Sequence, residues 1–110
     1  MLLKVGRHLR PRPHFKMIVS REEGENNFLR GYRKQFTHLE TRSHGGPLVL
    51  VDGAFESEDD ALLAARIAAR FSQGRDAAEV EVALTDLAGS ERQLRVQPLP
   101  ADELPQDWYV

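Results

Sequence analysis

The chain has 110 residues, of which 41% are hydrophobic and 29% are charged, as in an ordinary soluble protein of one domain. It contains no cysteine, which excludes disulfides and thiolate zinc sites. The first residues become charged too soon for a signal peptide, and no apolar run approaches the roughly 18 residues that a membrane helix needs. We therefore expect a single cytoplasmic domain over residues 1–110 with no membrane partner.

Charge is distributed unevenly along the chain. Residues 1–45 hold ten Lys or Arg and four Asp or Glu, whereas residues 46–110 hold five and thirteen. The basic part also contains all the histidines, which are His8, His14, His38 and His44. This split indicates a polyanionic partner for part of the surface. The alternative is two oppositely charged halves that attract each other within one solvated surface.

A basic hairpin is predicted at the start of the chain. Alternation over residues 3–10 indicates a strand with one basic face and one inward face. The basic face would hold Lys4, Gly6, His8 and Arg10, and the inward face Leu3, Val5 and Leu9 with Arg7 as its charged exception. Prolines cannot donate to a ladder, so residues 10–14 are predicted as the connection to a second strand over residues 15–19. This basic face is a suitable binding surface for the phosphate backbone of a nucleic acid.

The first helix is predicted from a capping-box pattern. Ser20 is followed three residues later by Glu23, so Ser20 is expected to cap a helix that opens at Arg21. The helix is expected to end near Gly31, because glycine costs about 1 kcal/mol inside a helix. Its predicted buried stripe is Phe28, Leu29 and Tyr32. The cluster at its end is Arg30, Arg33 and Lys34, which either complement the helix dipole or bind a ligand.

The second half of the chain reads as strand, helix and hairpin. A weak strand is expected over residues 35–41, and the apolar run over residues 48–51 indicates a central strand buried on both faces. Ser57 opens a second capping box, and the clearest helix runs from Glu58 to about Ser72, with Leu63, Ile67 and Phe71 repeating along its buried face. Alternating residues then predict strands over residues 79–84 and 93–97. From about residue 98 we expect an irregular tail in which Trp108 is either packed or available to a partner. The order ββαββαββ gives an α+β domain with a mainly antiparallel or mixed sheet and both helices on one side.

Patterns for catalysis or metal binding are weak. Ser20 and Ser57 are better explained as helix caps than as nucleophiles, and the histidines do not have the spacing of a helical ligand pair. The pair Gly45 and Gly46 precedes a strand rather than a helix, so it indicates a tight turn and not a phosphate loop. We therefore expect no catalytic residue, no metal and no cofactor, and the basic hairpin remains the candidate site.

Several short motifs, in their order, resemble the NFACT-R RNA-binding domain, and more narrowly the divergent form at the C-terminus of thiouridylase-like PP-loop proteins. The motifs are Gly6-Arg7-His8-Leu9-Arg10, Lys16-Met17-Ile18-Val19-Ser20-Arg21, Glu25-Asn26 with Leu29, Gly46-Pro47-Leu48-Val49-Leu50-Val51, and Ala69-Arg70-Phe71-Ser72. The resemblance spans about residues 5–85 and implies a non-catalytic module that binds RNA, with tRNA as the expected RNA and a PP-loop tRNA-modification (thiolation) domain as an expected partner. The RNA-binding positions that it implies are Arg7, His8, Arg10, Lys16, Arg21 and Asn26.

Two other functions stay open beside RNA binding. In the first, the basic and acidic halves of a protein-interaction domain dock onto a catalytic partner. In the second, which the residues favour least, the chain is a small hydrolase or metal enzyme. A contiguous positive surface near the first hairpin would favour RNA, and an exposed apolar patch would favour a protein partner.

Overall fold

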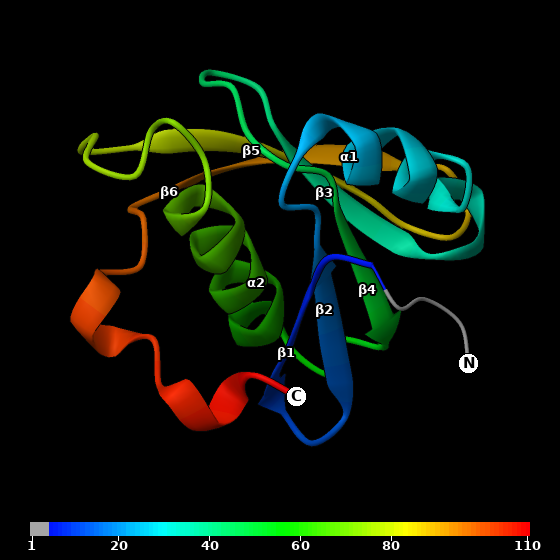
Figure 1. The fold of residues 1–110 in the computed structure, drawn as a ribbon, viewed down its shortest axis with the longest axis horizontal. Coiled ribbons are helices and arrows are strands. Elements are labelled where there is room, and N and C mark those ends of the chain that lie inside the picture. The colour runs from blue at the N-terminus through cyan, green and yellow to red at the C-terminus, as the bar shows by residue number, and fades with distance from the viewer. Residues whose placement is uncertain (1–4) are drawn as a thin grey trace.

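The computed structural model describes residues 5–110, which form one antiparallel sheet flanked by two α-helices (Figure 1). The strands are β1 (Arg7–Arg12), β2 (Phe15–Val19), β3 (Thr37–Thr41), β4 (Val49–Gly53), β5 (Val80–Thr85) and β6 (Glu91–Val96). The helices are α1 (Glu23–Arg30) and α2 (Glu58–Arg70), with short 3-10 turns at Arg33–Gln35, Ala101–Glu103 and Gln106–Trp108. The α+β class and the order ββαββαββ are confirmed. The predicted places of Leu3 and Lys4 lie outside the described residues.

The apolar run before Asp52 forms an interior strand, as predicted. The sheet order is β1-β2-β4-β3-β5-β6, and every neighbouring pair is antiparallel. Leu48, Val49, Leu50 and Val51 are all buried, at 2% exposure or less. Because successive side chains of a strand point to opposite faces, β4 contributes to a hydrophobic core on each side of the sheet.

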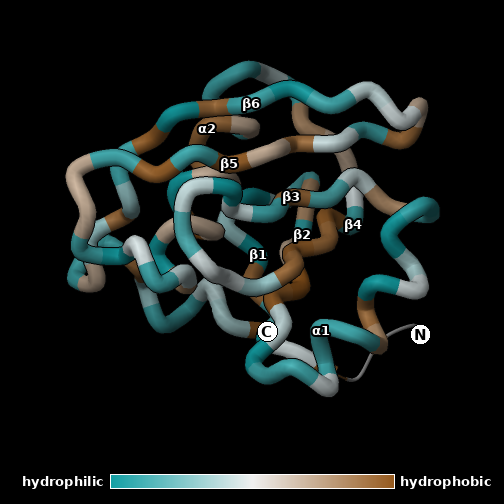
Figure 2. Tube along the Cα trace, turned by 90° about the horizontal axis from the view of Figure 1, so that it is seen from above, coloured by the Kyte–Doolittle hydropathy of each residue, from teal (hydrophilic) through white to brown (hydrophobic). Residues whose placement is uncertain are grey.

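The two helices pack on opposite faces of the sheet, which corrects the prediction that both lie on one side. Ile67 of α2 belongs to the larger core together with Met17 of β2, whereas Leu29 of α1 packs with the next residue of β2, Ile18. Figure 2 shows the hydrophobic strands β2 and β4 between the two helices. The sequence could not decide this point, because a strand that is apolar on both faces can accept a helix on either side.

The connection between β1 and β2 is shorter than predicted. β1 continues through Pro11 to Arg12, which leaves only Pro13 and His14 between the strands instead of residues 10–14. Pro11 is tolerated because β1 lies at the edge of the sheet and its pairing with β2 shifts register between Leu9 and Arg12. An edge strand with such an irregularity does not need a ladder hydrogen bond from every residue.

Helix α2 begins as predicted, and it ends at Arg70 rather than near Ser72. The Ser57 hydroxyl accepts a hydrogen bond from the Asp60 N–H at 3.4 Å, and acidic residues fill the first turn. The face toward the sheet consists largely of small buried side chains, which are Ala61, Ala64, Ala65, Ala68 and Ala69. These residues let the helix backbone approach the sheet closely around Ile67.

Replacing Ser57 with alanine is expected to reduce the free energy of unfolding by about 1 kcal/mol, because the Asp60 N–H loses its cap. The matched control is Ser90→Ala, since the Ser90 hydroxyl forms no hydrogen bond within residues 5–110 and only its backbone pairs with Asp86. Thermal unfolding of both variants tests the cap. Equal melting temperatures for the two variants would show that Ser57 contributes nothing to the helix start.

The C-terminal tail closes the edge of β1. After β6 it passes α2, where the Arg66 guanidinium donates to the Gln97 carbonyl at 2.9 Å. It ends beside β1, where Tyr109 pairs with Leu9 and the Val110 N–H donates to the His8 carbonyl at 3.0 Å (Figure 1). Trp108 packs against the larger core, which is the first of the two alternatives that the sequence left open. Among residues 5–110, no helix has the length and apolar character that a membrane crossing requires.

Candidate nucleic-acid interface

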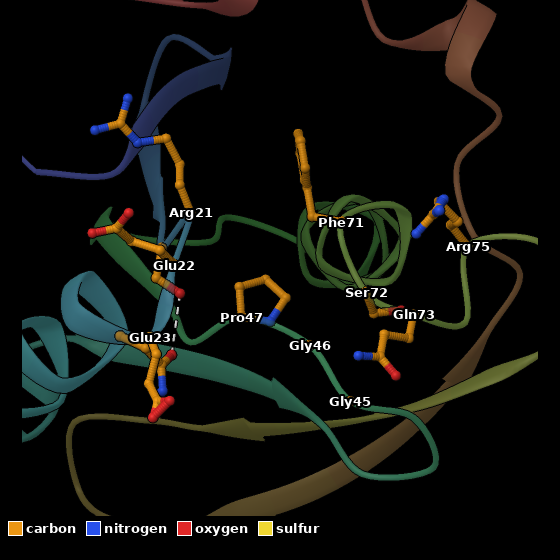
Figure 3. Close-up of a pocket in the computed structure, with 12 residues that line it drawn as sticks. Arg21, Glu22, Glu23, Gly45, Gly46, Pro47, Phe71, Ser72, Gln73 and Arg75 are labelled. Carbon is orange, nitrogen blue, oxygen red and sulfur yellow. Dashed lines mark hydrogen bonds between the residues drawn. The ribbon is translucent and has the colours of Figure 1, made fainter.

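A pocket of about 360 Å³ opens between the start of α1, the loop before β4 and the end of α2. We call it the α2-end pocket. Its lining is Ser20, Arg21, Glu22, Glu23, Asn26, Gly45, Gly46, Pro47, Phe71, Ser72, Gln73 and Arg75. Figure 3 shows the Phe71 ring standing between Arg21 and Arg75, with the chain from Gly45 to Pro47 crossing below. Segments far apart in the sequence therefore form one concave site.

Ser20 builds this site by fixing two segments together, and it does not cap α1. Its hydroxyl donates to Asn26 Oδ1 at 3.1 Å and accepts from the Leu48 N–H at 3.2 Å, and the same Asn26 oxygen accepts from that N–H at 2.8 Å. Helix α1 begins at Glu23, with Glu22 as an N-cap residue whose side chain makes no capping hydrogen bond. The predicted capping box is therefore wrong, because the Ser20 hydroxyl is already committed to the entry of β4.

The predicted buried stripe of α1 is only partly right. Leu29 is fully buried, but Phe28 is 49% exposed and contacts Tyr32 at a ring distance of 5.4 Å. The helix ends at Arg30 with Gly31 as its C-cap, as predicted. Arg33 donates to the Arg30 carbonyl at 3.0 Å, which supports the helix-dipole interpretation of this basic cluster.

Glu25 anchors the N-terminal segment to α1. Its carboxylate accepts hydrogen bonds from the Arg21 guanidinium at 2.6 Å, the Arg21 N–H at 2.8 Å and the Gly6 N–H at 3.1 Å. Gly6 adopts a φ of +82°. The alternation had placed Val5 on the same face as Leu9, but this bend places Val5 in the smaller core on the α1 side of the sheet. The hydrogen bond from the Arg21 guanidinium is the main reason why the pKa of Glu25 falls from 4.5 to about 2.

Glu25 is therefore expected to make stability depend on pH in the acidic range. A carboxyl whose pKa is lowered by folding stabilises the protein above its unfolded pKa, and this contribution is lost as the pH falls from 4.5 to about 2. Melting temperatures of the parent should fall over this window, and Glu25→Gln should flatten part of that fall. Glu23→Gln is the control, because the exposed Glu23 carboxylate makes no hydrogen bond within residues 5–110. Identical pH profiles for both variants would contradict the anchoring by Glu25.

The glycine pair allows the loop before β4 to lie directly on the end of α2. The Gln73 N–H donates to the Gly45 carbonyl at 2.7 Å. A Cβ at Gly46 would lie 2.6 Å from Thr41 Oγ1 and 2.8 Å from Ser72 Cβ, closer than side chains tolerate. Gly46 is therefore needed for close approach, which the sequence interpretation as a simple tight turn did not include.

Arginines surround the pocket. Arg7 shares its face of β1 with Leu9, points toward α2 and places its guanidinium carbon 5.3 Å from the centre of the Phe71 ring. This distance is that of a cation–π contact. Six arginines among residues 5–110 form ion pairs, and they are Arg12, Arg21, Arg30, Arg42, Arg92 and Arg95. We define the arginine rim as Arg7, Arg21 and Arg75; within residues 5–110, only Arg21 of the three has an acidic partner.

The structure separates the six predicted RNA-binding residues into two groups. Arg21 and Asn26 line the α2-end pocket and Arg7 lies next to it. The other three, His8, Arg10 and Lys16, lie on the opposite face of the hairpin. This face is on the α1 side of the sheet, because His8 pairs with Ile18, which packs against α1. In that group, Arg10 donates to the Pro13 carbonyl at 3.0 Å. The alternation had already assigned Arg7 to the inward face and His8 and Arg10 to the basic face, and the structure agrees; RNA contact by each of the six residues stays a prediction.

Sequence reasoning missed the part of the pocket that α2 supplies. Phe71 was assigned to the buried stripe of the helix, and Arg75 was not singled out. The glycine pair and the motif over residues 69–72 were noted separately, and these were the available signals. Nothing in either pattern alone indicated that the two segments meet.

A second pocket of about 460 Å³ lies beside β3 and the β5–β6 turn, on the face of the sheet opposite α2. Some of its charged groups form ion pairs, whereas Arg33 and Lys34 have no acidic partner within residues 5–110. Arg42 pairs with Glu91 at 3.2 Å, and Glu40 pairs with Arg30 at 2.7 Å. The α2-end pocket is the better candidate despite its smaller volume, because the aromatic ring of Phe71 and the motif residues Arg21 and Asn26 line it.

Comparison with known proteins gives a family and a fold. The model of the family described as "NFACT protein RNA binding domain" matches residues 6–109. No curated protein matches the chain in sequence. A solved structure, described as "The structure of the C-terminal of the fibronectin/fibrinogen-binding protein from Streptococcus suis (FBPS)", matches with a TM-score of 0.77 and 20% identity. The match covers 100% of this chain and 51% of that one, so the chain spans about half the length of that structure and shares its fold.

Proposed function

We propose that the RNA bound by this chain is tRNA, on the premise that the chain belongs to the NFACT protein RNA binding domain family. One observation carries the proposal. Arg7, Arg21 and Arg75, from three separate segments, gather around a pocket that contains the half-buried aromatic ring of Phe71. Compact folded RNAs such as tRNA present both a dense phosphate backbone and unpaired bases in loops, and such a site suits both features.

The arginine rim supplies the attraction. Arginine holds phosphates bidentately through its planar fork, and Arg7 is held in place by its contact with Phe71. His8, Arg10 and Lys16, on the other face of the same hairpin, would contact a more distant part of the same backbone. All six sequence-predicted residues would then contact the RNA, with the main contact at the α2-end pocket.

The proposed activity is binding without catalysis. The two serines of the pocket have their hydroxyls committed, because Ser20 bonds to Asn26 and Ser72 donates to the Ala69 carbonyl at 2.7 Å. We propose that chemistry on the RNA is performed by a partner, a cytoplasmic PP-loop tRNA-modification domain. The resemblance in sequence to the C-terminal module of thiouridylase-like proteins supports this partner.

The choice of RNA is tested by measuring the affinity of the domain for three radiolabelled RNAs. They are tRNA, a perfect duplex and an unstructured strand, all of similar length. The proposal expects the tightest binding to tRNA. Equal affinity for all three RNAs would mean that the domain binds RNA without a preference for tRNA, and no binding at low salt would favour the protein-docking alternative.

The partner is tested by adding the domain to a PP-loop enzyme that lacks its own RNA-binding module. A binding module should lower the KM for tRNA and leave kcat unchanged.

A further inference from the structure

We infer that the α2-end pocket receives one unpaired, unstacked nucleotide of the RNA, with its base against the Phe71–Arg7 pair and its phosphates on Arg7 and Arg75. This inference rests on the proposed RNA binding at the same site. It adds the structural class of the target, which is a loop, bulge or single-stranded end and not the side of a duplex.

The shape of the pocket supports a single inserted group. Its volume of about 360 Å³ lies at the lower end of the range for small-molecule sites, roughly 300–1,000 Å³. The floor is preformed, because Gly46 packs against Thr41 and Ser72 without room for a Cβ. The bases of an RNA duplex are stacked and paired, so they cannot enter such a concavity, whereas an unpaired base can.

Phe71 and Arg7 form the stacking surface. Phe71 is only partly buried, although it packs against the larger core, and the Arg7 guanidinium lies 5.3 Å from its ring centre. Unpaired bases stack on aromatic rings and on arginine planes, and such stacking tolerates any base because every base has a π-face. The cation also draws the adjoining phosphate toward the same place.

Charge sets the direction in which the nucleotide enters. Glu22 and Glu23 lie on the α1 side of the pocket, whereas Arg7 and Arg75 lie on the β1 and α2 side (Figure 3 labels all of these except Arg7). Phosphates are repelled by the α1 side, so they follow the arginines and the base points toward α1. The Asn26 oxygen is occupied by Leu48 and Ser20, which leaves its amide NH₂ to donate to an acceptor on the base edge.

The test compares two variants that each lose one aromatic ring. Phe71→Leu removes the proposed stacking surface, and Phe28→Leu removes a ring that is 49% exposed on α1, outside the lining of the pocket. The probes are an RNA hairpin with 2-aminopurine at an unpaired loop position and a blunt RNA duplex of the same length. We expect Phe71→Leu to bind the hairpin about tenfold more weakly, to bind the duplex like the parent and to lose the fluorescence change of the 2-aminopurine. Phe28→Leu should behave like the parent.

Phe71→Tyr keeps the ring and should keep hairpin binding, which separates stacking from a folding defect. Hairpin binding that is unchanged in Phe71→Leu would overturn the inference while leaving RNA binding intact. Equal losses on hairpin and duplex would overturn it as well. A parent that binds neither RNA would overturn the proposed function itself, so the two failures are distinguishable.

Discussion

Replacing Ile67 with alanine is expected to reduce the free energy of unfolding by about 2–5 kcal/mol. Ile67 has 0% exposure and lies at the centre of the α2 face, surrounded by alanines that cannot move to fill the space. The loss combines the transfer of the missing methylenes with the cavity that they leave. Chemical denaturation with an unchanged m-value is the measurement, because a changed m-value would indicate a different denatured or native state.

Leu87→Ala is the matched control for this variant. Leu87 lies in the β5–β6 turn and is 67% exposed, so its truncation should change stability by no more than about 0.5 kcal/mol. If Ile67→Ala and Leu87→Ala unfold at the same denaturant concentration, α2 does not pack on the sheet through this face. The placement of the α2-end pocket would then also be wrong.

Replacing both Arg7 and Arg75 with alanine is expected to weaken RNA binding strongly at low salt. Each phosphate contact contributes about −0.7 on single strands and about −0.9 on duplex to the slope of log affinity against log salt, because bound counterions are released. Losing two contacts should therefore make the slope shallower by about 1.4 to 1.8. Arg75 is the companion of Arg7 in this variant because both flank the α2-end pocket, whereas Arg10 lies on the opposite face of the hairpin.

Arg92→Ala combined with Arg95→Ala removes the same charge from β6. Arg92 pairs with Glu58 at 2.8 Å and Arg95 with Glu81 at 3.4 Å, so these arginines are already partly neutralised. Affinity and salt slope should stay close to those of the parent. Equal losses from both double variants would mean that net charge, and not the arginine rim, drives binding.

The strands were predictable because their side-chain alternation is local. Phe15, Met17 and Val19 face one core exactly as a period of two requires, and the interior position of β4 followed from its apolar run. The side chosen by each helix was not predictable, since β4 is apolar on both faces. The capping box at Ser20 failed for a related reason. The Ser20 hydroxyl binds Leu48, which is 28 residues away in the sequence, and a local pattern cannot reveal such a partner.

The candidate site was half predictable. Resemblance to a family pointed to six residues, of which Arg21 and Asn26 line the α2-end pocket and Arg7 lies beside it. Arg75 lies in the part of the chain that is acidic overall, so the charge split directed attention away from it. Phe71 looked like one more core residue at helical spacing, and only the approach of β1 shows that its ring also contacts a cation.

The most direct test of RNA binding at the α2-end pocket is an NMR titration of the labelled domain with tRNA at low salt. Binding there predicts that the amide shifts concentrate at Arg21, at Gly45 and Gly46, and from Ser72 to Arg75, while the amides of β6 (Glu91–Val96) stay unchanged. Shifts that concentrate on β6 with the α2-end pocket unaffected, or no shifts at all, would contradict the assignment of this pocket as the RNA site.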